Sequence, residues 1–160
     1  MRILVGDDSS LNTKLLGIAL RAALDGCDVR ECESVQKMIL HCRSQRFDVV
    51  VTDQDYGDAA PRGHDFVREL RQQRHWETPH DVPVVFCTSS PRSHDVTACG
   101  ADAIWSKPFP DVPTIGSTLR RLMAARESGR EKQNWKVCTN TTSPTSTSCT
   151  HSRFAKEFVV

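Results

Sequence analysis

The chain has 160 residues, which fits one domain of ordinary size with a single sizeable core. Its formal net charge of +1 gives no overall attraction to nucleic acid or to an anionic membrane surface. No apolar run approaches the roughly 18–20 residues that a membrane-spanning helix needs, and the opening "MRILVGDD" meets two acids too early for a signal peptide. These features predict a soluble, cytoplasmic protein.

Seven cysteines are present, an odd number that includes no CxxC pair and no zinc-ligand spacing. Several occupy positions that suit a small apolar side chain, as in "VVFCT". We expect unpaired, mostly buried thiols, with a disulfide or redox role as the weaker alternative. The seven are Cys27, Cys32, Cys42, Cys87, Cys99, Cys138 and Cys149.

The first half of the chain alternates strand-length apolar runs with helical patterns. Residues 2–5 ("RILV") predict a strand, and the helix after it begins at Ser9 or Ser10 and ends near Gly26. Its apolar face consists of Leu11, Leu15, Ile18, Ala19 and Ala22. A second strand at 27–32, a short helix with Val35, Met38 and Ile39, and a strand at 47–51 ("FDVVV") follow. The last of these is apolar on both faces, as strands inside a parallel sheet are.

The second half continues the same alternation. A loop at 53–63 leads to a helix whose core residues are Phe66, Val67 and Leu70 and whose outer face carries Arg68, Arg71 and Arg74. Strands are predicted at 82–87 and 101–105, with a short helix ending at Cys99 between them. The final helix contains Ile115, Leu119, Leu122 and Met123. Five strands alternating with helices predict a single α/β domain with a doubly wound, five-stranded parallel sheet and helices on both faces.

The end of the chain differs in composition. Residues 139–152 ("TNTTSPTSTSCTHS") are almost all small and polar, so they cannot bury enough surface to order themselves. We therefore expect a domain at 1–127 and a Ser/Thr-rich, disordered tail at 128–160.

Polar residues stand at the carboxyl end of four predicted strands, where doubly wound sheets gather functional groups. Each one alone fits a helix cap or a turn, but the conjunction of four strand ends favours a shared site. The residues are Asp7, Asp8, Asp53, Asp55, Thr88, Ser89, Ser90, Ser106 and Lys107. One lysine cannot neutralise several neighbouring carboxylates, and a hard divalent cation such as Mg²⁺ resolves that repulsion. Its open positions suit phosphate oxygens, and Asp53 is then free to attack phosphorus and form an acyl phosphate.

The stretches "ILVGDDS", "FDVVVTD", "PVVFCTSS" and "GADAIWSKPF" resemble the response-regulator receiver domain of phosphorelay signalling, over about residues 1–125. The resemblance implies a flavodoxin-like fold and transfer of a phosphoryl group to Asp53 from a histidine kinase or histidine phosphotransfer protein. It implies Mg²⁺ held by Asp8 directly, by Asp7 largely through water, by Asp53 and by the backbone carbonyl of Asp55. It also implies phosphoryl contacts from Thr88, Ser89 and Lys107. The implied output is contact with a protein partner through the face formed by the fourth helix, fifth strand and fifth helix.

Three features depart from the family pattern. The loop after Asp53 is about two residues longer than usual and has Gly57 where a proline is common. Ile104 occupies the position of the switch aromatic, and Trp105, one residue later, should face the other side of its strand. Asp55 adds an acidic side chain near the metal site.

Other interpretations stay open. A receiver that folds but is not phosphorylated would serve only for docking. The run "VVVTDQDYG" also resembles the signature of haloacid dehalogenase-like phosphotransferases, with Asp53 and Asp55 as nucleophile and acid/base. However, the acidic pair lies at the N-terminus, which does not suit that family's order of motifs. Glutamates interspersed among the arginines argue against a nucleic-acid surface.

Overall fold

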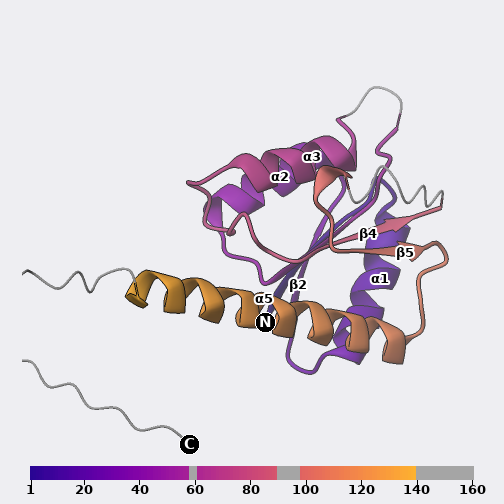
Figure 1. Ribbon diagram of the computed structural model, residues 1–160. Helices are drawn as coiled ribbons and strands as arrows, with labels where there is room; N and C mark the ends of the chain where they lie inside the picture. Colours follow the sequence, from indigo (N-terminus) through magenta and orange to yellow (C-terminus); the bar gives the residue numbers. More distant parts are fainter. Residues whose placement is uncertain (58–60, 90–97, 140–160) are drawn as a thin grey trace, which may run out of the picture.

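A five-stranded parallel sheet with strand order β2-β1-β3-β4-β5 forms the centre of the molecule (Figure 1). The computed structural model describes residues 1–57, 61–89 and 98–139, with side chains through residue 129. The strands are β1 (Arg2–Gly6), β2 (Asp28–Cys32), β3 (Val49–Thr52), β4 (Val84–Thr88) and β5 (Ala103–Ser106). The helices are α1 (Ser10–Ala23), α2 (Val35–Ser44), α3 (Gly63–Gln72) and α5 (Val112–Thr139). The predicted doubly wound α/β fold is confirmed.

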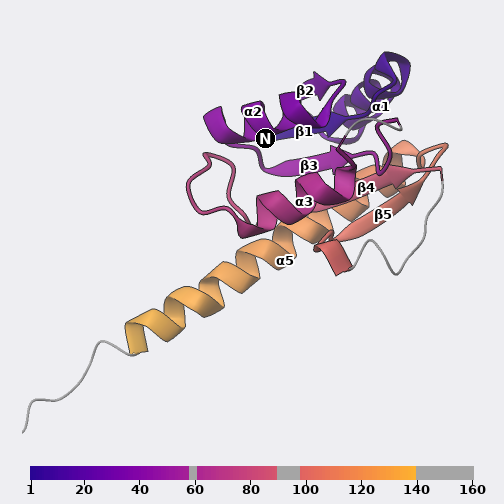
Figure 2. The ribbon, with the colours of Figure 1, turned by 90° about the horizontal axis from the view of Figure 1, so that it is seen from above.

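Each face of the sheet carries its own apolar core. Helices α2 and α3 cover one face, and α1 and α5 cover the other (Figures 1 and 2). Alternate residues of β3 serve the two cores, because Val50 points to the first and Val49 and Val51 to the second. All four residues of β3 are buried, as its apolar sequence predicts. The five cysteines with described side chains are free thiols, and four of them are buried.

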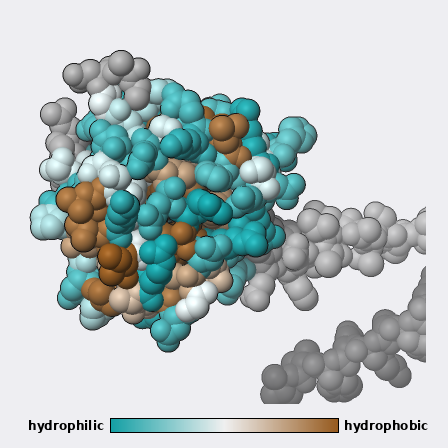
Figure 3. Space-filling view, turned by 180° about the vertical axis from the view of Figure 1, so that it is seen from behind, coloured by the Kyte–Doolittle hydropathy of each residue, from teal (hydrophilic) through white to brown (hydrophobic). Residues whose placement is uncertain are grey.

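Helix α1 packs with a different face from the one predicted. Its buried residues are Thr13, Leu16, Gly17 and Leu20, whereas Leu11, Leu15 and Ile18 are 63%, 45% and 63% exposed. Leu16 and Leu20 belong to the core on the α1–α5 face, and Gly17 beside them faces the carboxylate end of Glu31. The apolar residues of the other face are left on the surface, where Figure 3 shows apolar side chains on the side that carries α1.

Arg71 on α3 is half-buried against neighbouring loops and is not part of a solvated helix face. Its guanidinium donates hydrogen bonds to the carbonyls of Gly100, His80 and Val82 at 2.7–2.8 Å, and to Asp102 Oδ2 at 2.8 Å. The prediction that Arg71 lies on an outer face together with Arg68 is therefore wrong. Position 71 falls at the edge of the buried stripe, and a long side chain there reaches the loops that flank β4.

Helix α5 continues well past its predicted end. It reaches Thr139 and projects beyond the body of the domain (Figure 2), so the segment 128–139 is helical rather than a disordered tail. The run "ESGREKQ" within it is rich in strong helix formers, which explains the extension. The remaining tail, 140–160, and most of the predicted fourth helix lie outside the described residues. Within the described part of the chain, α5 and the other helices are too polar or too short to span a bilayer.

Candidate functional site

The register of the sheet brings the ends of β1 and β3 together. Gly6 pairs with Thr52, the last residue of each strand, so Asp7 and Asp53 follow side by side. The Asp53 backbone N–H donates to the Gly6 carbonyl at 2.8 Å, which extends the pairing by one residue. On the other flank, the Lys107 N–H donates to the Thr88 carbonyl at 2.8 Å, so β5 delivers Lys107 to the same edge.

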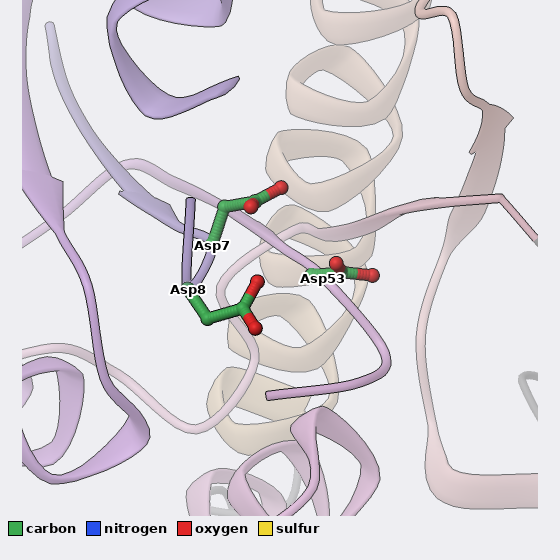
Figure 4. Close-up of side chains that lie close together, drawn as sticks. All are labelled: Asp7, Asp8 and Asp53. Atoms are coloured by element: carbon green, nitrogen blue, oxygen red, sulfur yellow. The ribbon is translucent and has the colours of Figure 1, made fainter. Parts of the chain in front are cut away.

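Three carboxylates gather at this edge. One oxygen from each of Asp7, Asp8 and Asp53 lies within 4.8 Å of the others (Figure 4). Asp7 and Asp53 are buried, whereas Asp8 is exposed at the mouth of the site. The predicted convergence of these three residues is thus seen in the structure.

Lys107 lies between the two buried carboxylates. Its Nζ is 2.6 Å from Asp7 Oδ2 and 2.5 Å from Asp53 Oδ2. Burial alone would lower the pKa of Lys107, but the hydrogen bonds that Lys107 donates to Asp53 and Asp7 outweigh it and raise that pKa. Lys107 is therefore a stable ammonium that contacts two acids at once.

The environment of Asp53 disfavours its ionised form. Burial raises the pKa of the Asp53 carboxyl, and the Lys107 ammonium and the Gln54 N–H offset this rise only in part. The Gln54 N–H donates to Asp53 Oδ1 at 2.6 Å. Asp7 adds a nearby negative charge that raises the pKa of Asp53 further.

Asn12 and Ser9 support Asp7 from the first turn of α1. The Ser9 N–H donates to Asp7 Oδ1 at 2.9 Å, and Asn12 Nδ2 donates to the same oxygen at 3.1 Å. These bonds fix the Asp7 carboxylate against the start of the helix. Sequence analysis did not include Asn12, although an amide five residues after an acid, on the first turn of a helix, is a usable signal.

The donor set fits a divalent cation with a preference for oxygen. By formal charge, three carboxylates and one ammonium leave two negative charges at the site. Mg²⁺ uses one or two carboxylates and keeps several waters, and Asp8 is exposed where such waters would lie. These three residues therefore fit the predicted ion.

The remaining predicted residues are distributed around the cluster. Asp55 is exposed and its side chain is outside the three-carboxylate group, although its N–H donates to Asp53 Oδ1 at 3.4 Å. Thr88 is buried at the end of β4, and Ser89 beside it is exposed. Ser90 lies outside the described residues.

Ile104 and Trp105 lie on opposite faces of β5, as the alternation of side chains along a strand predicts. Ile104 packs, partly buried, against the core on the α2–α3 face. Trp105 is buried in the core on the α1–α5 face, and its indole N–H has no hydrogen-bond partner among the described residues. Trp105 therefore does not substitute for an aromatic side chain at position 104.

A pocket of about 210 Å³ opens beside the carboxylates. It lies between the first turns of α1 and the segment after β5, and Leu15 of the exposed apolar face contributes to its wall. Its lining residues are Asp7, Asn12, Leu15, Leu16, Cys87, Lys107, Pro108 and Phe109. The acidic site is thus bordered on one side by apolar surface.

The fold and the acidic edge together define the class of protein. Residues 3–118 match the response regulator receiver domain, and the chain belongs to this family of two-component signalling domains. The predicted family is confirmed, which also disfavours the haloacid dehalogenase-like interpretation.

One curated relative is the KDP operon transcriptional regulatory protein KdpE of Escherichia coli K12, 31% identical over 126 residues. The match covers 77% of this chain, and the chain spans about half (50%) of that protein's length.

Solved structures share the fold. They include the Methanospirillum hungatei CheY-like receiver domain protein, with a TM-score of 0.68 at 16% identity, covering 80% of this chain and 97% of that one. Vibrio cholerae CheY4 has a TM-score of 0.63 at 24% identity over 76% of this chain and 97% of its own. The receiver domain of the Pseudomonas aeruginosa sensor histidine kinase PA1611, which has a magnesium ion in its active site cleft, has a TM-score of 0.64 at 22% identity. That match covers 77% of this chain and 97% of that one.

Proposed function

We propose that this chain accepts a phosphoryl group on Asp53 from a phosphohistidine of a histidine kinase or histidine phosphotransfer protein. The observation that carries the proposal is the position of Lys107 Nζ between the buried carboxylates of Asp7 and Asp53, with Asp8 beside them. Membership of the receiver family supports it. The chain would catalyse its own phosphorylation and dephosphorylation and no reaction of an outside substrate.

Asp7, Asp8 and Asp53 would hold Mg²⁺, with the backbone carbonyl of Asp55 as a further ligand. When bound, the ion supplies positive charge and open coordination positions for phosphoryl oxygens. In the transfer, an oxygen of the Asp53 carboxylate forms a bond to phosphorus while the phosphorus–nitrogen bond breaks. The electron pair of that bond returns to the imidazole nitrogen of the donor.

The other residues of the edge stabilise the new phosphoryl group in this proposal. Lys107 is already in contact with Asp53 Oδ2, so its ammonium is placed to bind a phosphoryl oxygen as charge moves from the carboxylate. Thr88 and Ser89, at the end of β4, would contribute hydroxyl hydrogen bonds.

The donor's docking surface must border the acceptor, because its phosphohistidine has to reach Asp53. The exposed apolar face of α1 (Leu11, Leu15 and Ile18) meets this condition, since Leu15 also lines the pocket that contains Lys107. An apolar surface this close to a charged site suits a protein partner. We therefore place the donor on α1 and the pocket beside it.

Output is proposed to pass through the face formed by the fourth helix, β5 and α5, where phosphorylation would shift a two-state equilibrium. Ile104 lies on the α2–α3 side of β5, and Trp105 lies on the α1–α5 side. With no aromatic at 104, a coupling that uses one is not available to this chain.

Tryptophan fluorescence during titration with Mg²⁺ and then beryllofluoride tests the proposal, because Trp105 lies two residues from Lys107. We expect a metal-dependent change, and then a beryllofluoride-dependent change that is absent in Asp53→Asn. A folded sample without either response would favour a receiver used only for docking.

A further inference from the structure

The backbone around Asp53 is held by a side chain that sequence analysis did not single out. Tyr56, three residues after Asp53, is 6% exposed and belongs to the core on the α2–α3 face. Its hydroxyl lies 2.8 Å from Thr52 Oγ1 and 3.1 Å from Met38 Sδ. It is the only tyrosine in the 160-residue sequence.

The hydroxyls of Tyr56 and Thr52 form a short chain of hydrogen bonds that ends on the acceptor residue. Thr52 Oγ1 donates its single proton to the Asp53 backbone carbonyl at 3.0 Å. With that proton used, the Tyr56 hydroxyl donates to Thr52 Oγ1, because a hydroxyl oxygen is a stronger acceptor than the thioether sulfur of Met38, the other acceptor in reach. The position of Tyr56 is therefore linked to the backbone of Asp53.

Space for the tyrosine is provided by Gly6 of β1. A side chain at position 6 would collide with the Tyr56 hydroxyl and with Met38 Sδ. Gly6 is also the residue whose carbonyl accepts from the Asp53 N–H. The same glycine thus pairs with the acceptor's backbone and leaves room for the ring of Tyr56.

A second attachment lies at the far end of the long loop. The Gly63 N–H donates to the Gln54 carbonyl at 3.0 Å, and a side chain at 63 would collide with the Asp53 carbonyl. Gly57, directly after Tyr56, has a φ of 82°, a conformation that favours glycine where the chain turns. The segment 53–56 precedes the part of the loop in which we expect the extra length.

We propose that Tyr56 is a positioning residue of the acceptor site. Its hydrogen bond to Thr52, and the bond from Thr52 to Asp53, hold the segment 53–56 and with it the backbone carbonyl of Asp55. This arrangement keeps the site in place although the loop is longer than usual. The consequence for Mg²⁺ rests on the proposed function, whereas the consequence for the backbone does not.

The test compares Tyr56→Phe, which removes only the hydroxyl, with Thr52→Val and with the double variant. Two quantities are measured: the Kd for Mg²⁺ and the hydrogen exchange rates of the Gln54 and Asp55 amides. We expect Tyr56→Phe to raise the Kd about tenfold, as loss of a group that orients a ligand does, and to speed exchange at both amides. The double variant should match Thr52→Val, because Tyr56 acts on Asp53 only through the Thr52 hydroxyl.

Thr78→Val is the matched control. Thr78 is fully buried and holds the segment that precedes β3. Its hydroxyl donates to the Gln45 carbonyl at 2.6 Å and accepts from the Phe47 N–H at 3.1 Å. This variant should lose stability while keeping the parent's Mg²⁺ affinity and its exchange rates at Gln54 and Asp55.

Parent-like Kd and exchange in Tyr56→Phe would overturn the proposal, and so would equal effects from Thr78→Val. If the parent itself failed to bind Mg²⁺, the metal part of the proposed function would fall. The exchange rates of Gln54 and Asp55 would then decide the role of Tyr56 alone.

Discussion

At the scale of single residues, the site depends on how one ammonium is shared between two buried acids. Lys107 contacts Asp7 and Asp53 at once, yet burial still raises the pKa of Asp53. The ionised Asp53 carboxylate therefore lowers the free energy of unfolding. A bound cation, or a covalent bond from Asp53 to phosphorus, should reduce this cost.

Asp53→Asn should raise the free energy of unfolding in the absence of divalent metal. The folded protein holds the Asp53 proton more tightly than the unfolded chain does, so the stability that protonation gives is lost as pH rises through the folded pKa. The advantage of the variant should be absent below the ordinary pKa of an aspartate and reach its full size above the raised one. Urea unfolding in EDTA across that range measures it; a difference independent of pH would contradict the assignment.

Lys107→Ala should lower the free energy of unfolding by about 3 kcal/mol in EDTA, because it leaves two buried carboxylates without their cation. Added Mg²⁺ should restore part of this loss, because Mg²⁺ binding should be largely intact in the variant. Phosphorylation of the variant should no longer be coupled to output. Denaturation with and without Mg²⁺ tests the first part. Equal sensitivity of variant and parent to Mg²⁺ would show that Lys107 does not neutralise the site.

Sequence reasoning found Asp7, Asp8, Asp53 and Lys107, because parallel strands place their carboxyl ends at one edge. It did not find Tyr56, whose proposed role depends on the space that Gly6 of β1 leaves for the Tyr56 hydroxyl. That contact is non-local, and no spacing within the sequence indicates it.

At the scale of elements, α1 shows where periodicity is ambiguous. Two sets of residues have helical spacing, Leu11, Leu15 and Ile18 on one side and Thr13, Leu16, Gly17 and Leu20 on the other. The more apolar set is exposed, whereas Leu16 and Leu20 of the other set pack in the core on the α1–α5 face. Hydrophobicity alone therefore cannot identify the buried face of α1, because the exposed face that we propose as the docking surface is also apolar.

Core and surface substitutions on α1 should separate the two faces. Leu16→Ala and Leu20→Ala each remove buried methyl groups and should cost about 2–5 kcal/mol of unfolding free energy. Leu11→Ser and Ile18→Ser should change it by less than about 0.5 kcal/mol. Chemical denaturation of the four variants checks this, and a large loss from Ile18→Ser would mean that the exposed face is packed.

At the scale of the whole molecule, one end of the sheet carries the candidate site and the other end carries contacts that stabilise the fold. The carboxyl edge carries the acidic site, while at the opposite edge Arg71 joins α3 to the segments before β4 and β5. Burial lowers the pKa of Arg71, and Asp102 opposes this effect. Arg71 belongs to the structure of the domain and not to a charged surface.

Arg71→Ala should therefore destabilise the fold by about 2 kcal/mol, since three carbonyls lose their charged donor and Asp102 keeps only the Val84 N–H. Arg68→Ala is the matched control, because the Arg68–Asp65 ion pair is exposed and should contribute less than about 1 kcal/mol. Thermal unfolding of both variants makes the comparison. Similar melting temperatures for the two would contradict the buried role of Arg71.

The order of the described elements could be predicted, because five strand-length runs separated by helical patterns admit few arrangements. The length of α5 could not, because residues 126–134 form an uninterrupted run of polar residues and glycine that resembles a linker. The family match ends at residue 118, whereas the helix continues to Thr139.

The central claim is that Asp53 is the phosphoacceptor. Incubation with phosphoramidate and Mg²⁺, followed by intact-mass spectrometry of parent and Asp53→Asn, tests it most directly. We predict one phosphoryl group on the parent, dependent on Mg²⁺, and none on the variant. Equal incorporation into Asp53→Asn, or none into a folded parent with Mg²⁺ present, would contradict the account.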